Sequence, residues 1–145
     1  ILIYLVLLFG IVMGIYFVVL KGIPEFNEWQ SQILATVTSV IPIILIFACF
    51  DYNKGSIGKQ KSGLKLHYKN KNFGTSLIRN IIKFLPWQLA HIGVIHGIYS
   101  EFDALAIIFT NLSMALALVM LIMSLVRKDK RHLGDLIAGT QIQVQ

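Results

Sequence analysis

The stretch Ala104–Val126, ALAIIFTNLSMALALVMLIMSLV, decides the class of fold, because its 23 residues include no charged side chain. A helix rises about 1.5 Å per residue, so about 20 apolar residues cross the hydrocarbon core of a bilayer. Three further apolar runs lie at 1–20, 33–50 and 80–99. We expect each run to be a transmembrane helix, which predicts an all-α membrane protein with four such helices.

The composition argues against the alternative, a soluble protein with buried helices. Apolar residues make up 56% of the chain, charged residues make up 14%, and the mean hydropathy is +0.72. A soluble domain averages about 25% charged residues. In a chain of 145 residues, four such helices would leave nothing to cover them.

The distribution of charge predicts the orientation. Most of the 13 lysines and arginines lie in 54–83 and 127–131, whereas the connections 21–31 and 100–103 are acidic, with Lys21 as their only base. Basic connections stay in the cytoplasm. We therefore expect both termini to be cytoplasmic. The pI of about 9.6 then reflects topology and contact with anionic lipid headgroups, and we expect no nucleic-acid partner.

Two cytoplasmic segments show the alternation of short strands. In the loop 51–76, the apolar side chains of Leu64, Leu66 and Tyr68 occupy every second position, and the residues 140–145 of the tail 127–145 also alternate. Period-two alternation is typical of a strand. We predict that the two strands pair as a small cytoplasmic β-ribbon.

Local breakers predict where helices end or bend. Lys21–Pro24 should end the first helix, and Pro42 should kink the second. The sequence 70–74 is typical of a turn, so Thr75 or Ser76 is expected to cap the third helix.

The third helix carries most of the polar side chains within the apolar runs. Arg79, Asn80, Lys83 and His91 are candidate functional or ion-coupling residues, because polar groups at membrane depth usually face the bundle interior or water. The alternatives are that Arg79 and Lys83 reach the headgroups and that His91 makes a hydrogen bond between helices. Near the helix end, His96 is expected to be solvated.

No pattern in the sequence indicates an enzyme, a cofactor or a metal. The glycines of Gly55–Gln60 lack the spacing of a phosphate-binding loop, and Cys49 is the only cysteine. His132 and Asp135 are three residues apart, but two ligands are weak support for a metal site. We expect no catalytic residue, no cofactor and no metal.

Four separate motifs resemble those of the RDD family of small bacterial membrane proteins. The motifs are Gly55-Ser-Ile-Gly58-Lys59, Gly63-Leu-Lys-Leu66, Arg79-Asn80-Ile-Ile-Lys83 and Arg131-His-Leu-Gly-Asp135-Leu-Ile-Ala-Gly139-Thr140. Within them, Ser56 stands near the family threonine, His132 comes early, and Gly134 replaces the histidine before the aspartate.

The resemblance implies one RDD-like domain over residues 1–145 and a place in the bacterial inner membrane. It assigns structural roles to the motif residues Gly58, Lys59, Gly63, Gly139 and Thr140. The family's arginine and first aspartate are expected before Ile1, and Asp135 is expected to be the other aspartate.

Two functions follow as hypotheses. Some family members are linked to sodium/proton exchange, so the first is a transporter such as a cation/proton antiporter. The second is a non-catalytic subunit or scaffold of a larger membrane complex. The partner calls are a second copy of the chain or a larger membrane protein. Under both hypotheses, Asp135 and Arg131 are candidate functional or ion-coupling residues. The Asp135 carboxylate could lock the tail beneath the helix bundle, or it could form a cation or proton site.

Overall fold

The computed structural model describes residues 2–22 and 25–144, and these are mostly helical. The elements in chain order are α1 (Leu2–Val18), α2 (Glu28–Ala35), the π-helical turn η1 (Thr36–Val40), α3 (Ile41–Tyr52), α4 (Ile57–Lys61), β1 (Leu64–Tyr68), α5 (Phe73–Ser100), α6 (Ala104–Val126), α7 (Leu133–Ile137) and β2 (Thr140–Val144).

The described residues contain three helical segments long and apolar enough to cross a membrane. They are Glu28–Lys61, Phe73–Ser100 and Ala104–Val126. The apolar helix α1 is shorter, with 17 residues. The predicted class, a helical membrane protein with a small sheet, is therefore confirmed, whereas α1 as a fourth crossing stays a prediction.

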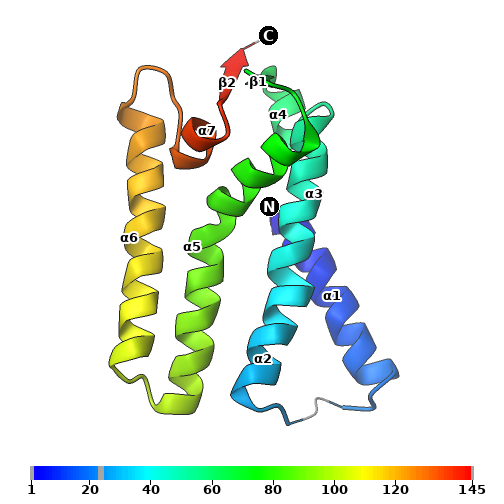
Figure 1. Cartoon of the computed structure of the whole chain (residues 1–145). Coiled ribbons are helices and arrows are strands. Elements are labelled where there is room, and N and C mark those ends of the chain that lie inside the picture. The colour runs from blue at the N-terminus through cyan, green and yellow to red at the C-terminus, as the bar shows by residue number, and fades with distance from the viewer. Residues whose placement is uncertain (1, 23–24, 145) are drawn as a thin grey trace.

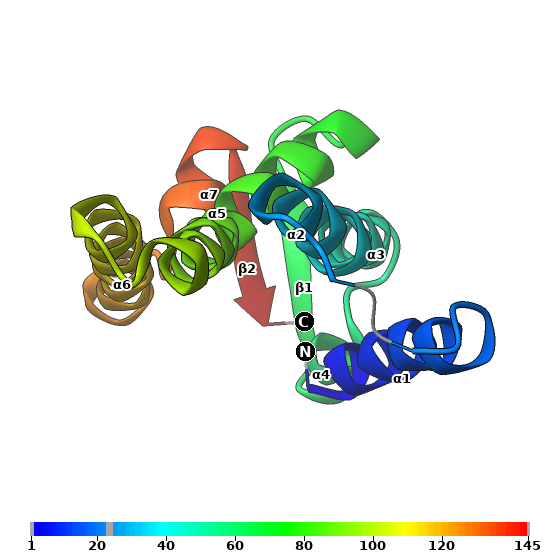
Figure 2. The same ribbon diagram turned by 90° about the horizontal axis from the view of Figure 1, so that it is seen from below.

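The long helices stand side by side and alternate in direction (Figure 1). Viewed along their axes they form a bent row, in which α5 lies between α6 and the α2–α3 helix, and α1 packs at the far end (Figure 2). We call the end that carries α4, α7 and the two strands the ribbon end. The opposite end, with the α1–α2 and α5–α6 connections, is the loop end.

Two predicted helix boundaries were wrong. The third helix begins at Phe73, before the apolar run at 80–99. Its cap is Asn72, not Thr75 or Ser76, because the Asn72 side chain accepts a hydrogen bond from the Thr75 N–H at 2.7 Å. The second helix begins at Glu28, not near residue 33, behind a capping box made by Asn27 and Gln30. The polar first turns of these helices concealed their true starts.

The second helix is irregular just before Pro42. Proline has no N–H to donate to the preceding turn, and the chain passes through η1 immediately ahead of it. Single π-helical turns are rare and occur often at functional sites. The predicted breaker at Ile23 and Pro24 lies outside the described residues.

The predicted pairing of the two strands is present. β1 and β2 are antiparallel, with Leu66 opposite Ile142 and Tyr68 opposite Thr140. A left-handed glycine precedes each strand, Gly63 with φ of +63° and Gly139 with φ of +62°. Only glycine adopts this conformation without strain, which gives both motif glycines a physical role at the ribbon end.

A close contact joins α5 to α6. A Cβ atom on Gly93 would lie 2.6 Å from the Thr110 Oγ1 and 3.1 Å from the Ala106 carbonyl oxygen. One hydrogen bond, from the Ser113 hydroxyl to the Pro86 carbonyl at 2.7 Å, also crosses this contact. Small residues at this point let the two backbones approach each other.

Candidate functional site

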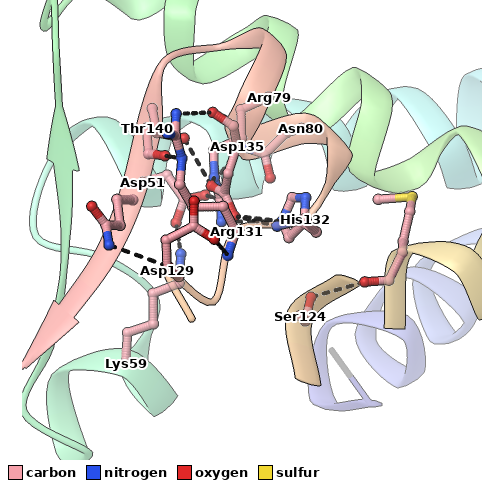
Figure 3. A network of polar contacts seen from close by, with 12 residues as sticks. Asp51, Lys59, Arg79, Asn80, Ser124, Asp129, Arg131, His132, Asp135 and Thr140 are labelled. Atoms are coloured by element: carbon pink, nitrogen blue, oxygen red, sulfur yellow. Dashed lines mark hydrogen bonds and ion pairs between the residues drawn. The ribbon is translucent and has the colours of Figure 1, made fainter. Parts of the chain in front are cut away.

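The most charged part of the interior lies at the ribbon end and is built around Arg79 of α5. Its side chain is only 1% exposed. The guanidinium donates through Nε to the Asp135 Oδ1 at 2.6 Å and through Nη1 to the Asp51 Oδ2 (Figure 3). A planar guanidinium offers several donors in one plane, so one arginine can join two carboxylates on different elements.

Asp51, at the end of α3, also binds two further groups. The Lys59 ammonium from α4 donates to its Oδ1, and the Asn80 side-chain amide donates to its Oδ2 at 3.2 Å. One turn before Asn80, the Ser76 hydroxyl donates to the Ala48 carbonyl at 2.7 Å. These contacts attach α3, α4 and α5 to one another.

Asp135, in α7, is completely buried. The Thr140 hydroxyl donates to its Oδ1 at 2.8 Å, and the His132 Nε2 lies 3.2 Å from its Oδ2. Arg131 does not bind the carboxylate. It donates instead to the Asp135 main-chain carbonyl at 3.1 Å and to the Thr140 carbonyl at 2.8 Å.

We call Asp51, Lys59, Arg79, His132 and Asp135 the ionic cluster. Burial lowers the pKa of His132 to about 4, an effect that the Asp135 carboxylate opposes and the Arg79 guanidinium reinforces. The imidazole is therefore neutral at pH 7, and its Nδ1 is a buried atom for which the described residues offer no hydrogen-bond partner. Two carboxylates then face two cations, so the charges of the cluster balance.

Such a balanced cluster locks the tail to the helices. Removing one member of a buried ion pair typically costs about 3–5 kcal/mol, because it leaves an uncompensated charge. Asp135 contacts Arg79 directly. The snorkelling alternative for Arg79 was wrong, since this side chain faces the interior.

Of the predicted candidates, Arg79 and Asp135 belong to the cluster, Asn80 and Arg131 donate to its members, and the other two make no hydrogen bond to it. The ammonium of Lys83 lies over the rings of Phe47 and Phe84, 4.6 and 5.1 Å from their centroids. The Nδ1 of His91 is 2.9 Å from the carbonyl of Trp87 in its own helix. Neither side chain contacts a carboxylate among the residues that the structure describes.

Of the motif residues, Lys59 belongs to the cluster and Thr140 donates to it, whereas Gly63 and Gly139 take left-handed backbone conformations before the two strands. Gly58 lies within α4, where an added Cβ atom would meet no atom of the described residues within 4 Å. The interpretation of the sequence missed Asp51, which it placed in a loop, and considered His132 only as a weak metal ligand. The signal for Asp51 was Arg79 itself, because an arginine within an apolar helix needs a carboxylate at the same depth.

A groove lies toward the loop end, with a volume of about 760 Å³. Its floor is one face of α5, and its walls come from α2–η1 and α6. The lining residues are Glu28, Trp29, Gln32, Ile33, Thr36, Val37, Gln88, Ile92, His96, Leu105 and Phe109. We call this the loop-end groove.

The polar side chains within the groove bind one another. Gln88 donates to the Thr36 hydroxyl at 3.1 Å, and Gln32 donates to the Ile92 carbonyl at 3.1 Å. The remaining wall is therefore largely apolar. One turn below Gln88, Phe84 begins the packed core of the helices.

His96 lies at the mouth of the groove between two carboxylates. Its Nδ1 is 2.7 Å from the Glu28 Oε1, and its Nε2 is 3.2 Å from the Asp103 Oδ1. A neutral imidazole has one N–H, so contact through both nitrogens fits the imidazolium form. The prediction of simple solvation for His96 was wrong, because acidic side chains from two other segments contact it.

An apolar plug separates the groove from the ionic cluster. Ile43, Phe47 and Phe84 form its buried centre, and α1 contributes Tyr4 and Leu8 to its side. The molecule thus carries an acidic mouth with an apolar groove at one end, a packed plug in the middle, and a balanced ionic cluster at the other. The described residues contain no group of three or more potential metal ligands.

Apolar helices of this length, with charge confined to an internal cluster and the helix ends, define an integral membrane protein. The sequence profile of the RDD family matches residues 1–139, and the chain belongs to that family. No curated protein and no solved structure matches the chain.

Proposed function

We propose that the protein is a transporter that exchanges a cation for a proton. The observation that carries the proposal is the order of three features along α5: a groove with an acidic mouth toward the loop end, a buried apolar plug, and the ionic cluster at the ribbon end. A gated transporter requires an apolar barrier in the middle of the molecule and polar groups above and below that barrier. The acidic mouth attracts cations, because Glu28 and Asp103 both lie beside it.

Proton coupling is supported by His96 at the mouth of the groove. This imidazole contacts carboxylates through both nitrogens, an arrangement that favours its protonated form. Histidine changes charge near physiological pH and is a common proton carrier. Local change at the plug is supported by η1 and Pro42, which interrupt the regular helix beside Ile43.

We place the ribbon end in the cytoplasm and the loop end outside, with α1 as a fourth crossing of the bacterial inner membrane. The basic loops at the ribbon end support this orientation, and they would meet anionic headgroups there. Labelling of single cysteines in a Cys49→Ser background tests it. A cysteine at Lys21 should react with an impermeant reagent on intact cells, and one at Lys128 should not.

The transport proposal is tested in proteoliposomes that contain a pH-sensitive dye. A gradient of the transported cation, tested with sodium, potassium and an organic cation in turn, should drive proton movement in vesicles with the protein and not in protein-free vesicles. Glu28→Gln should slow this movement, whereas Glu101→Gln should not. Equal proton movement in vesicles with and without the protein would refute cation/proton exchange.

The open arrangement of the helices favours a second candidate, a non-catalytic subunit or scaffold. The helices form a bent row and not a closed ring (Figure 2). One face of α6 is apolar and exposed at Leu118, Leu121 and Leu125. Gentle native extraction followed by native mass spectrometry separates the two. A foreign chain in fixed ratio favours the subunit, and a monomer or homo-oligomer favours the transporter.

A further inference from the structure

We propose that the loop-end groove binds an amphipathic organic cation, a compound with an apolar body and a positive group at one end. This inference rests on the proposed function and specifies its substrate. The groove matches such a compound because its charged side chains lie only at the mouth. The rest of its wall is largely apolar.

The wall of the groove is unsuited to a small hydrated metal ion. Gln32, Thr36 and Gln88 have their side chains in hydrogen bonds with other parts of the protein. Most of the remaining surface comes from Ile33, Val37, Ile92, Leu105 and Phe109. A hydrated ion would lose its water along this part of the wall and gain few ligands in return, whereas an apolar body would gain by leaving water.

The mouth of the groove supplies negative charge that would attract the positive group of the ligand. Glu28 lines the groove, and Asp103 lies on the far side of His96. The indole of Trp29 is exposed at the same rim, and the face of an indole attracts organic cations. The volume, about 760 Å³, lies in the range of sites for drug-sized molecules, about 300–1,000 Å³.

The position of His96 makes this site competitive with a proton. The charged and titratable groups that face His96 within the described chain are Glu28 from α2 and Asp103 at the start of α6. The groove residues that α6 adds, Leu105 and Phe109, are apolar. An organic cation beside Glu28 would take the place of the imidazolium charge. His96 would then release one proton to the solvent at the mouth, so one positive charge enters as one leaves.

The test is a binding measurement in detergent, which needs no transport. Calorimetric titration of the full chain with tetraphenylphosphonium is compared with titration by neutral triphenylphosphine oxide. Glu28→Gln should weaken phosphonium binding by about tenfold, the loss of about 1.4 kcal/mol, and should leave binding of the neutral compound unchanged. Glu101→Gln is the matched control, and a thermal scan verifies that each variant is folded.

The pH profile gives a second readout. Phosphonium binding to the wild type should weaken as the pH falls from about 8 to about 5.5, because protonated His96 competes. His96→Gln should flatten that profile. Two results would overturn the inference: equal affinity for the phosphonium and the neutral compound, or phosphonium affinity that is unchanged in Glu28→Gln. The groove would then be a site for lipid chains.

The outcome is separable from that of the vesicle experiment. Phosphonium binding at Glu28 without any proton movement in vesicles would contradict transport and uphold the site. Metal-cation exchange in vesicles without Glu28-dependent phosphonium binding would uphold transport and overturn the substrate class.

Discussion

Arg79 is the residue on which the ribbon end depends, because its guanidinium contacts carboxylates from α3 and α7 at once. Lysine has a single ammonium group and cannot reproduce this geometry. We expect Arg79→Lys to lower the free energy of unfolding by about 3–5 kcal/mol, the cost of breaking a buried ion pair. Thermal unfolding in detergent measures the change.

The control for this prediction is Arg127→Lys, since Arg127 pairs with Asp129 at the exposed surface. Exposed pairs contribute about 0–1 kcal/mol, so this variant should unfold like the wild type. Equal stability of Arg79→Lys and Arg127→Lys would contradict the buried role of Arg79.

His132 predicts a dependence of stability on acid. Its pKa in the folded protein is about 4, below its ordinary value of 6.5, so the unfolded chain binds more protons between these values. Stability should therefore fall as the pH drops from 6.5 toward 4, with a loss of about 2 kcal/mol at pH 5 from this group.

Thermal scans at pH 7 and pH 5 check this expectation. His132→Gln should lose less stability between the two pH values than the wild type does. His67→Gln, on the exposed face of β1, should behave as the wild type. An unchanged difference in His132→Gln would show that His132 is not the group that titrates.

At this scale the sequence predicted part of the site. Asp135, Arg79, Asn80 and Lys59 were identifiable because polar residues stood beside apolar runs or in family motifs. Asp51 was not identifiable, because a charged residue at the end of an apolar run is assigned to the following loop unless its partner is known. The departure at Gly134 has a spatial reason. A Cβ at position 134 would lie 2.8 Å from the Arg79 carbonyl oxygen.

At the scale of elements, the contact between α5 and α6 rests on Gly93. A side chain there would collide with Thr110 on α6. We expect Gly93→Leu to reduce the free energy of unfolding by about 1–3 kcal/mol, the usual cost of overpacking. Gly14→Leu is the control, because a Cβ atom at Gly14 meets nothing within 4 Å. Equal stability of the two variants in detergent would disprove the close contact.

The sequence predicted the long helices and the strand pair because both rest on local periodicity. It did not predict α7, a short element whose packing depends on Arg79 from a distant helix. The true start of α5 was also hidden, since its first turns are polar and are held by the Asn72 cap and by Ser76. These features depend on tertiary contacts, which a periodic pattern does not contain.

At the scale of the whole molecule, the two ends have different chemistry. The loop end is acidic and holds a groove, whereas the ribbon end is basic in sequence and has a balanced ionic cluster inside. The plug of Ile43, Phe47 and Phe84 separates the two. Exchange across the membrane would require the plug and the ionic cluster to open in turn with the mouth.

The central claim, that the ionic cluster is part of a cation/proton path, is tested most directly by the Asp135→Asn variant in proteoliposomes. Asp129→Asn, at the exposed Arg127 pair, is the matched control, and both must elute as folded protein. The account predicts that Asp135→Asn loses cation-driven proton movement while Asp129→Asn keeps it. Proton movement at the wild-type rate in Asp135→Asn would contradict the account.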